Sequence, residues 1–312
     1  MIKYLKQAEI DFDKWDACIA NAMNSYVYAY SWYLDIVAGE WDALVEDDYS
    51  RVFPLPFRKK MGIKYIYQPA FTQVLGLFTI SLKGNNKLQE FLSAIPQEFK
   101  LIEINLNKFH IPKAKENITP KKNVNIELDL VSDYESLYSK YSSNLKRNIK
   151  KAKKNKLQIV EGIKPEQLIQ LFKENKGQEV KAYSDLDYVH LGRLIYMLIH
   201  KGMAKIYSVS SSENNLIASA LFVRDAHRHI FLFSGLSEEG KQKGAMPFLI
   251  DSFIQGHSAS NITLDFEGSN NENLARFYGS FGAEENAYYG IRMVQGGVAV
   301  RALLGVKDAL RS

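Results

Sequence analysis

The spacing of apolar residues in the second half of the chain predicts strands and helices in alternation. Residues 229–235 and 262–268 are apolar runs with the length of buried strands. Residues 246–254 form an apolar helical run, residues 271–282 a second helix, and residues 287–294 a last strand. This order of strand, helix, strand, helix and strand is typical of an α/β domain.

The first half of the chain has its own alternation of helical and strand-like segments. Ser31 stands where it would cap one predicted helix, and Gly39 stands where that helix would end. The predicted helices are residues 13–23, 31–38 and 87–99. The predicted strands are residues 41–45, 51–57, 64–67, 74–80 and 101–106. We therefore expect an α/β domain in this half as well.

Residues 107–123 are the predicted connection between the two domains. They contain Pro112, Pro120 and several lysines, and they show little apolar periodicity. We therefore expect an N-terminal domain over residues 1–122 and a C-terminal domain over residues 123–312. A helix at the end of the chain is expected to dock back on the first domain.

A strongly basic segment follows this connection. Residues 124–130 alternate as a strand, and residues 133–155 are helical with Leu145, Ile149 and Ala152 on one face. The basic residues on the other faces of this helix include Lys146, Arg147, Lys150 and Lys151. A solvated helix end explains these charges as well as a phosphate-binding surface does, so both interpretations stand.

The composition limits where and with what the protein acts. The chain has 312 residues, which suggests two domains, and its net charge of +5 favours anionic partners. A single cysteine, Cys18, excludes an internal disulfide, and we expect no metal site. Charges interrupt the start of the chain, and no apolar run reaches membrane-spanning length. We therefore expect a cytoplasmic protein with no integral membrane segment.

Asn271, Phe277, Tyr278 and Gly282 have a characteristic spacing along the last predicted helix. The spacing resembles the final helix of the GNAT acyltransferase superfamily, in which an Asn opens the helix, a Tyr follows and a Gly closes it. The resemblance implies that the Tyr278 hydroxyl lies beside a leaving thiolate and protonates it as a general acid. An amphipathic helix with a packed tyrosine is the other interpretation.

The turn at residues 236–245 corresponds to the donor loop of the GNAT enzymes. In that superfamily a glycine-rich turn binds the pyrophosphate of coenzyme A through N–H groups at a helix N-terminus. Lys241 and Gly244 match the pattern, whereas Met246 stands where a small residue is expected. A strand that splays near Gly235 would supply further N–H groups to polarise an acyl carbonyl.

Several segments along the chain extend the resemblance to one family. Residues 145–157 read LKRNIKKAKKNKL, and the aromatic-rich residues 28–36 lead into residues 41–45, 55–60 and 67–73. In this order the segments resemble the Fem-type peptidyltransferases. The resemblance implies an α/β (α+β) fold of two tandem GNAT-like acyltransferase domains with a cleft between them. The long helical-hairpin arm of some Fem enzymes has no counterpart here.

The Fem-type resemblance implies transfer of an acyl or aminoacyl group to an amine of an anionic acceptor in the cleft. A cell-envelope precursor is one such acceptor. The donor is aminoacyl-tRNA in known Fem-type enzymes, which would make tRNA a partner, and acyl-CoA is the other donor that the resemblance allows. Such chemistry needs an amine held within attack distance of a polarised carbonyl.

By analogy, two carboxylates flank the reaction. Strand alternation puts Asp265 and Glu267 on one face, where one of them would accept the amine proton, and a salt bridge or turn cap is the alternative for either. Arg58 and Lys59 would meet a diphosphate, or they form a solvated hairpin end.

Two further functions fit the sequence. One is an acyl-CoA-dependent GNAT N-acyltransferase with an altered pyrophosphate loop. The other is a non-catalytic module in which the basic helix and the cleft bind a nucleotide-sugar or an RNA end. The altered residues 240–245 favour the Fem-type transferase and the binding module over the acyl-CoA enzyme.

Overall fold

The computed structural model describes residues 1–60, 62–80, 87–175, 177, 183–226, 228–268 and 270–296. The chain divides into two compact units. Unit 1 consists of Met1–Asn123 and Ala287–Ser312, and unit 2 consists of Val124–Asn286. The last strand therefore belongs to unit 1, although we had expected it in the C-terminal domain. The helix expected at the end of the chain lies outside the described residues.

Unit 1 is a sheet with three α-helices and two short 3-10 helices among its described residues. Its strands are β1 (Ile2–Leu5), β2 (Trp41–Glu46), β3 (Arg51–Lys60), β4 (Ile63–Ile66), β5 (Phe78–Thr79), β6 (Phe99–Leu106) and most of β13 (Glu284–Val294). Its helices are η1 (Gln7–Glu9), α1 (Phe12–Asn21), η2 (Val27–Ala29), α2 (Ser31–Val37) and α3 (Leu88–Ala94). The strand order is β1-β2-β3-β4-β6-β13, and β5 pairs with β3.

Three expectations for this half were wrong in detail. Ser31 is the first residue of α2 rather than its cap, because its N–H and hydroxyl both donate to Asp16, at 2.7 and 2.9 Å. The strand expected at residues 74–80 is reduced to β5. The helix expected at residues 87–99 ends at Ala94, and Phe99 already belongs to β6.

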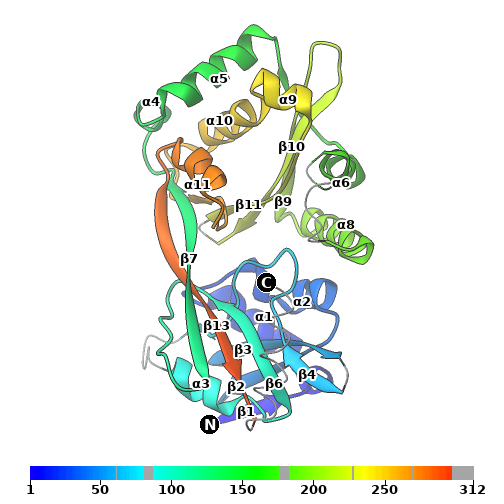
Figure 1. Ribbon diagram of the computed structural model, residues 1–312, viewed down its shortest axis with the longest axis vertical. Helices are drawn as coiled ribbons and strands as arrows, with labels where there is room; N and C mark the ends of the chain where they lie inside the picture. The colour runs from blue at the N-terminus through cyan, green and yellow to red at the C-terminus, as the bar shows by residue number, and fades with distance from the viewer. Residues whose placement is uncertain are drawn as a thin grey trace. The chain divides into compact units, whose positions relative to one another are not determined.

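Unit 2 has helices on both faces of a mixed sheet. Its strands are the second half of β7 (Ile118–Asp129), β8 (Gln158–Glu161), β9 (Ala204–Ser210), β10 (Leu216–Asp225), β11 (Arg228–Leu236) and β12 (Thr263–Asp265). Its helices are α4 (Tyr134–Ser139), α5 (Ser143–Lys154), α6 (Pro165–Glu174), α8 (Asp185–His200), α9 (Glu238–Lys243), α10 (Ala245–His257) and α11 (Glu272–Gly279). The strand order is β7-β12-β11-β10-β9-β8. Helices α5 and α10 lie over one face, and α6 and α8 lie over the other (Figure 1). The expected α/β class is confirmed.

The segment at residues 133–155 forms two helices instead of one. Ser142 separates them because its hydroxyl accepts a hydrogen bond from the Leu145 N–H and so caps α5. Its own N–H donates to the Ser280 carbonyl at 2.9 Å, which ties this break to the end of α11. The predicted connection at residues 107–123 also ends early, since β7 begins at Ile118.

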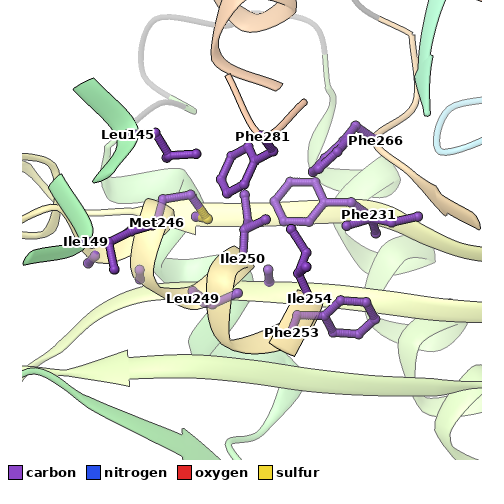
Figure 2. Packing of buried hydrophobic residues seen from close by; sticks show 14 of the residues in the cluster. Leu145, Ile149, Phe231, Met246, Leu249, Ile250, Phe253, Ile254, Phe266 and Phe281 are labelled. Atoms are coloured by element: carbon purple, nitrogen blue, oxygen red, sulfur yellow. The ribbon is translucent and has the colours of Figure 1, made fainter. Parts of the chain in front are cut away.

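The core of unit 2 is centred on α10. Leu145 and Ile149 of α5 pack on one side of it, and Phe231 of β11, Phe266 and Phe281 pack nearby (Figure 2). These α5 residues are the apolar positions that the helical spacing predicted, and burying each of them stabilises the fold by about 1.5–3 kcal/mol. The basic side chains of α5 consequently face outward.

Among the described residues, the helices are all too short or too polar to cross a lipid bilayer.

Candidate active site

The two central strands of unit 2 separate at one end. β11 and β12 run parallel and pair only where Arg228–Ile230 lies beside Thr263–Asp265, whereas β11 continues to Leu236. On the β10 side, Leu221 pairs with Phe233 and Phe222 pairs with Phe231, so the intervening residue of β11 is a bulge. Within the described chain, the far part of β11 thus has no strand partner on the β12 side. Its backbone N–H groups can polarise a carbonyl, as the sequence suggested for this strand.

Gly235 lies in this free part of β11 and serves to pack a helix. It pairs with Ser219 in the ladder, and a Cβ at Gly235 would lie 2.8 Å from the Phe172 nitrogen and 3.1 Å from the Leu168 carbonyl oxygen. Any side chain would therefore push α6 away from the sheet. The packing of α6 explains the glycine without a ligand.

Helix α11 directs Tyr278 toward this region. Asn271 caps the helix, because its side-chain oxygen accepts hydrogen bonds from the N–H groups of Asn273 and Leu274 at 3.0 and 3.3 Å. The Tyr278 ring stacks on Phe266, with the ring centroids 4.7 Å apart. Burial raises the pKa of Tyr278, and the Glu267 carboxylate raises it further. The hydroxyl is therefore protonated at neutral pH and can donate a proton.

Glu267 lies just beyond the end of β12. Its backbone has a φ of +58°, in the left-handed region that is costly for a residue with a side chain, and its N–H donates to Asp265 Oδ1 at 2.9 Å. It is half-buried, and its charge raises the pKa of both Tyr278 and Tyr183. The strand alternation that would have put Asp265 and Glu267 on one face ends at Asp265, so that expectation was wrong.

Asp265 is fully buried in a polar network that the sequence did not predict. Its side chain has 0% exposure, and its Oδ2 lies 3.4 Å from Arg228 Nη1. Burial and the Glu127 carboxylate raise the pKa of Asp265 to about 6, and Arg228 opposes them. Glu127 in turn accepts hydrogen bonds from the amides of Asn125 and Asn286, both at 3.0 Å. Since these partners come from β7, β11 and β13, no local sequence signal could have revealed them.

An aromatic cluster near Glu267 was also missed. Tyr183 contacts Phe172 and Tyr188, with ring centroids 6.4 and 6.0 Å apart, and Phe172 packs on Phe233 at 4.7 Å. Burial and then Glu267 raise the pKa of Tyr183. Tyr278 of α11 and Tyr183 of the segment before α8 are therefore both influenced by the same carboxylate.

The predicted donor loop is a helix and not an open turn. Residues 238–243 form α9, capped by Ser237, and Lys241 pairs with Glu238 at 3.6 Å. A Cβ at Gly240 would lie 2.2 Å from the Ile217 carbonyl oxygen, and one at Gly244 would lie 2.6 Å from that of Asn148. These glycines allow close backbone packing, and Ala245 and Met246 at the start of α10 are buried. The first turn of α10 is consequently covered, unlike a pyrophosphate cradle.

The basic residues of α5 lie together on its outer surface. Lys146 Nζ donates to the Ser139 carbonyl at 3.0 Å and lies 5.1 Å from the centre of the Tyr138 ring. Arg147 donates to the Asn144 side chain at 3.3 Å. Lys150 and Lys151 are exposed and form no ion pair with another described residue.

The other predicted basic pair belongs to unit 1. Arg58 and Lys59 are exposed at the end of β3, and the Arg58 guanidinium lies 4.2 Å from the centre of the Tyr67 ring. Across the described residues, no three His, Cys, Asp or Glu side chains are grouped so as to hold a metal ion.

Comparison with known proteins gives matches in structure but not in sequence. No family model matches the chain, and no curated protein matches it. FemX has a TM-score of 0.66 at 12% identity, over 92% of this chain and 96% of FemX. The C-terminal domain of a putative lysylphosphatidylglycerol synthetase from Agrobacterium fabrum has a TM-score of 0.58 at 10% identity, over 95% of each chain.

A third solved structure is also similar to this chain in fold. L-PGS from Bacillus licheniformis has a TM-score of 0.52 at 12% identity, over 95% of this chain and 96% of that one. Identities this low establish the fold alone. The chain therefore has a Fem-type, GNAT-like fold.

Proposed function

We propose that the protein is an N-acyl or N-aminoacyl transferase that acts on an amine of an anionic acceptor, such as a cell-envelope precursor. The observation that carries the proposal is the stacking of Tyr278 on Phe266, the neighbour of Glu267, just beyond the paired part of β12. A proton donor and a proton acceptor thus lie beside a free strand edge. Acyl transfer to an amine can use each of these three elements.

In the proposed reaction, the amine attacks the donor carbonyl while N–H groups of β11 stabilise the developing oxyanion. Glu267 accepts the proton that the attacking nitrogen loses. Tyr278 donates a proton to the departing oxygen or sulfur as its bond to the carbonyl carbon breaks. The products are an amide and the protonated leaving group, and Tyr278 regains its proton from Glu267 or from solvent.

Aminoacyl-tRNA is the donor we favour. Coenzyme A needs a turn with free N–H groups for its pyrophosphate, whereas residues 238–243 are helical and the first turn of α10 is covered. The basic face of α5 supplies the charge that phosphate groups require. We assign Lys146, Arg147, Lys150 and Lys151 to this contact, and Arg58 and Lys59 to the acceptor's negative charge.

Acyl-CoA is the second candidate donor, because a thiolate leaving group gives Tyr278 a clear role. A non-catalytic module that binds a nucleotide-sugar or an RNA end is the third possibility, supported by the basic face of α5 alone. These three proposals differ in the ligand bound and in whether a covalent product forms.

The test combines binding and chemistry. Thermal unfolding is measured with aminoacyl-tRNA, uncharged tRNA, coenzyme A, acyl-CoA and nucleotide-sugars, since a ligand of the native state raises its apparent stability. Donors that stabilise the protein are then mixed, in single-turnover amounts, with amine acceptors that carry a diphosphate. We expect an amide product from aminoacyl-tRNA. Stabilisation by a nucleotide-sugar or by tRNA without any product would support the binding module instead.

A further inference from the structure

Unit 2 contains an open cavity of about 840 Å³ that the proposed reaction does not use. Neither Tyr278 nor Glu267 lines it. Apolar side chains that include Phe277 and Ala283 form part of its wall, and Glu272, Arg276 and Glu285 add charges of both signs. An apolar surface with a few charged groups is the usual form of a small-molecule site.

The three charged residues have no partners of their own. Glu272 and Arg276 lie one turn apart on α11, and Glu285 lies near the start of β13. None of them forms an ion pair or a side-chain hydrogen bond with any other residue that the structure describes. Two free carboxylates and one free guanidinium around one cavity match a ligand that carries both an ammonium and a carboxylate.

Gly279 gives the cavity part of its space. It is the last residue of α11, and a Cβ there would meet no atom within 4 Å. The nearby Gly282 differs, since its φ is +80° and its Cβ would lie 2.9 Å from Lys140 Cβ. Packing and backbone geometry therefore explain Gly282 but not Gly279.

We propose that this cavity binds a small zwitterion with an apolar side chain, a free amino acid or a dipeptide. Its ammonium group pairs with Glu272 and Glu285, its carboxylate pairs with Arg276, and its side chain packs on Phe277 and Ala283. The cavity is distinct from the site of the proposed transfer. The binding proposal can therefore be tested whether or not the protein is a transferase.

The binding experiment is isothermal titration of the full chain with L-leucine and with L-leucyl-L-leucine. Exposed charges bind weakly, so we expect dissociation constants on the order of 1 mM. N-acetyl-L-leucinamide has the same side chain and no charges, and it should bind at least about tenfold more weakly. Failure of both zwitterions to bind, or equal binding of the uncharged compound, would overturn the proposal.

Matched variants locate the site. Gly279→Leu places an apolar side chain in the cavity and should weaken binding at least about tenfold, whereas Gly256→Leu, at an exposed position of α10 that is equally open, should leave it unchanged. Glu285→Gln and Arg276→Gln should each weaken binding about tenfold. Glu284→Gln removes the neighbouring exposed carboxylate, which does not line the cavity, and should have no effect. Unimpaired binding by a folded Gly279→Leu protein would refute this location.

Discussion

Asp265 Oδ1 accepts a hydrogen bond from the Glu267 N–H at 2.9 Å, and this contact closes a turn at the end of β12. The turn holds Glu267 at a φ of +58°, a conformation that costs on the order of 1–3 kcal/mol. Because Asp265 is fully buried and Glu267 is only half-buried, we assign Asp265 the role of positioning Glu267 for contact with the substrate. The strained backbone thus lowers stability at Glu267, the residue to which we assign proton acceptance in the proposed reaction.

Substitutions at Glu267 should separate this loss of stability from activity. Glu267→Gln keeps the strained backbone and removes the proton acceptor, so we expect the single-turnover rate to fall about 10²-fold with little change in stability. Glu267→Gly should lower the rate as much and also raise the free energy of unfolding by roughly 1 kcal/mol, because glycine accepts a positive φ. Urea unfolding and single-turnover assays measure the two effects. Full activity in both variants would remove Glu267 from the mechanism.

The buried Asp265 should leave a signature in the pH dependence of stability. Its pKa is about 6 in the folded protein against a usual 3.8, so the folded state holds this proton over a range where the unfolded state has lost it. The wild type should therefore lose stability relative to Asp265→Asn as the pH rises from about 4 to about 6, and the difference should then be constant. Urea unfolding at a series of pH values tests this. Parallel curves for the two proteins would show that Asp265 does not titrate in this range.

Local patterns predicted the parts of the fold that depend on a single segment. The helical spacing of Leu145, Ile149 and Ala152 identified the buried face of α5, and Asn271 was recognised at the start of α11. The α/β class followed from the same kind of pattern.

The features of the site that depend on contacts between distant segments could not be predicted from such local patterns. The left-handed backbone of Glu267 ended the strand alternation on which its predicted orientation relied. Arg228 and Asn286 are far in sequence from the carboxylates that they contact. The glycines of the predicted donor loop proved to be packing positions, because the carbonyl groups of Ile217 and Asn148 approach them from other elements.

The basic face of α5 should contribute to binding rather than to stability. Changing Lys146, Arg147, Lys150 and Lys151 together to Gln should weaken binding of tRNA and flatten its salt dependence, since phosphate contacts release counterions. The free energy of unfolding should change little, because exposed charges contribute little to it. Fluorescence anisotropy at several salt concentrations measures the effect.

The control for this change carries the same loss of charge elsewhere. Lys113, Lys115, Lys121 and Lys122 are exposed in unit 1, and changing all of them to Gln should leave the salt dependence close to that of the wild type. If the two variants lose equal affinity, net charge and not the α5 face governs binding.

Tyr278→Phe should identify the leaving group. The variant keeps the ring that stacks on Phe266 and removes only the hydroxyl, so the fold should be preserved. With an acyl-CoA donor we expect the single-turnover rate to fall by about 10²-fold at nearly unchanged donor affinity, because the thiolate then leaves without its acid. With aminoacyl-tRNA the ribose hydroxyl beside the leaving oxygen can transfer the proton, and the loss should be small. Tyr183→Phe, which removes the other hydroxyl near Glu267, should leave both rates unchanged. A large loss in Tyr183→Phe with none in Tyr278→Phe, for either donor, would transfer the general-acid role to Tyr183.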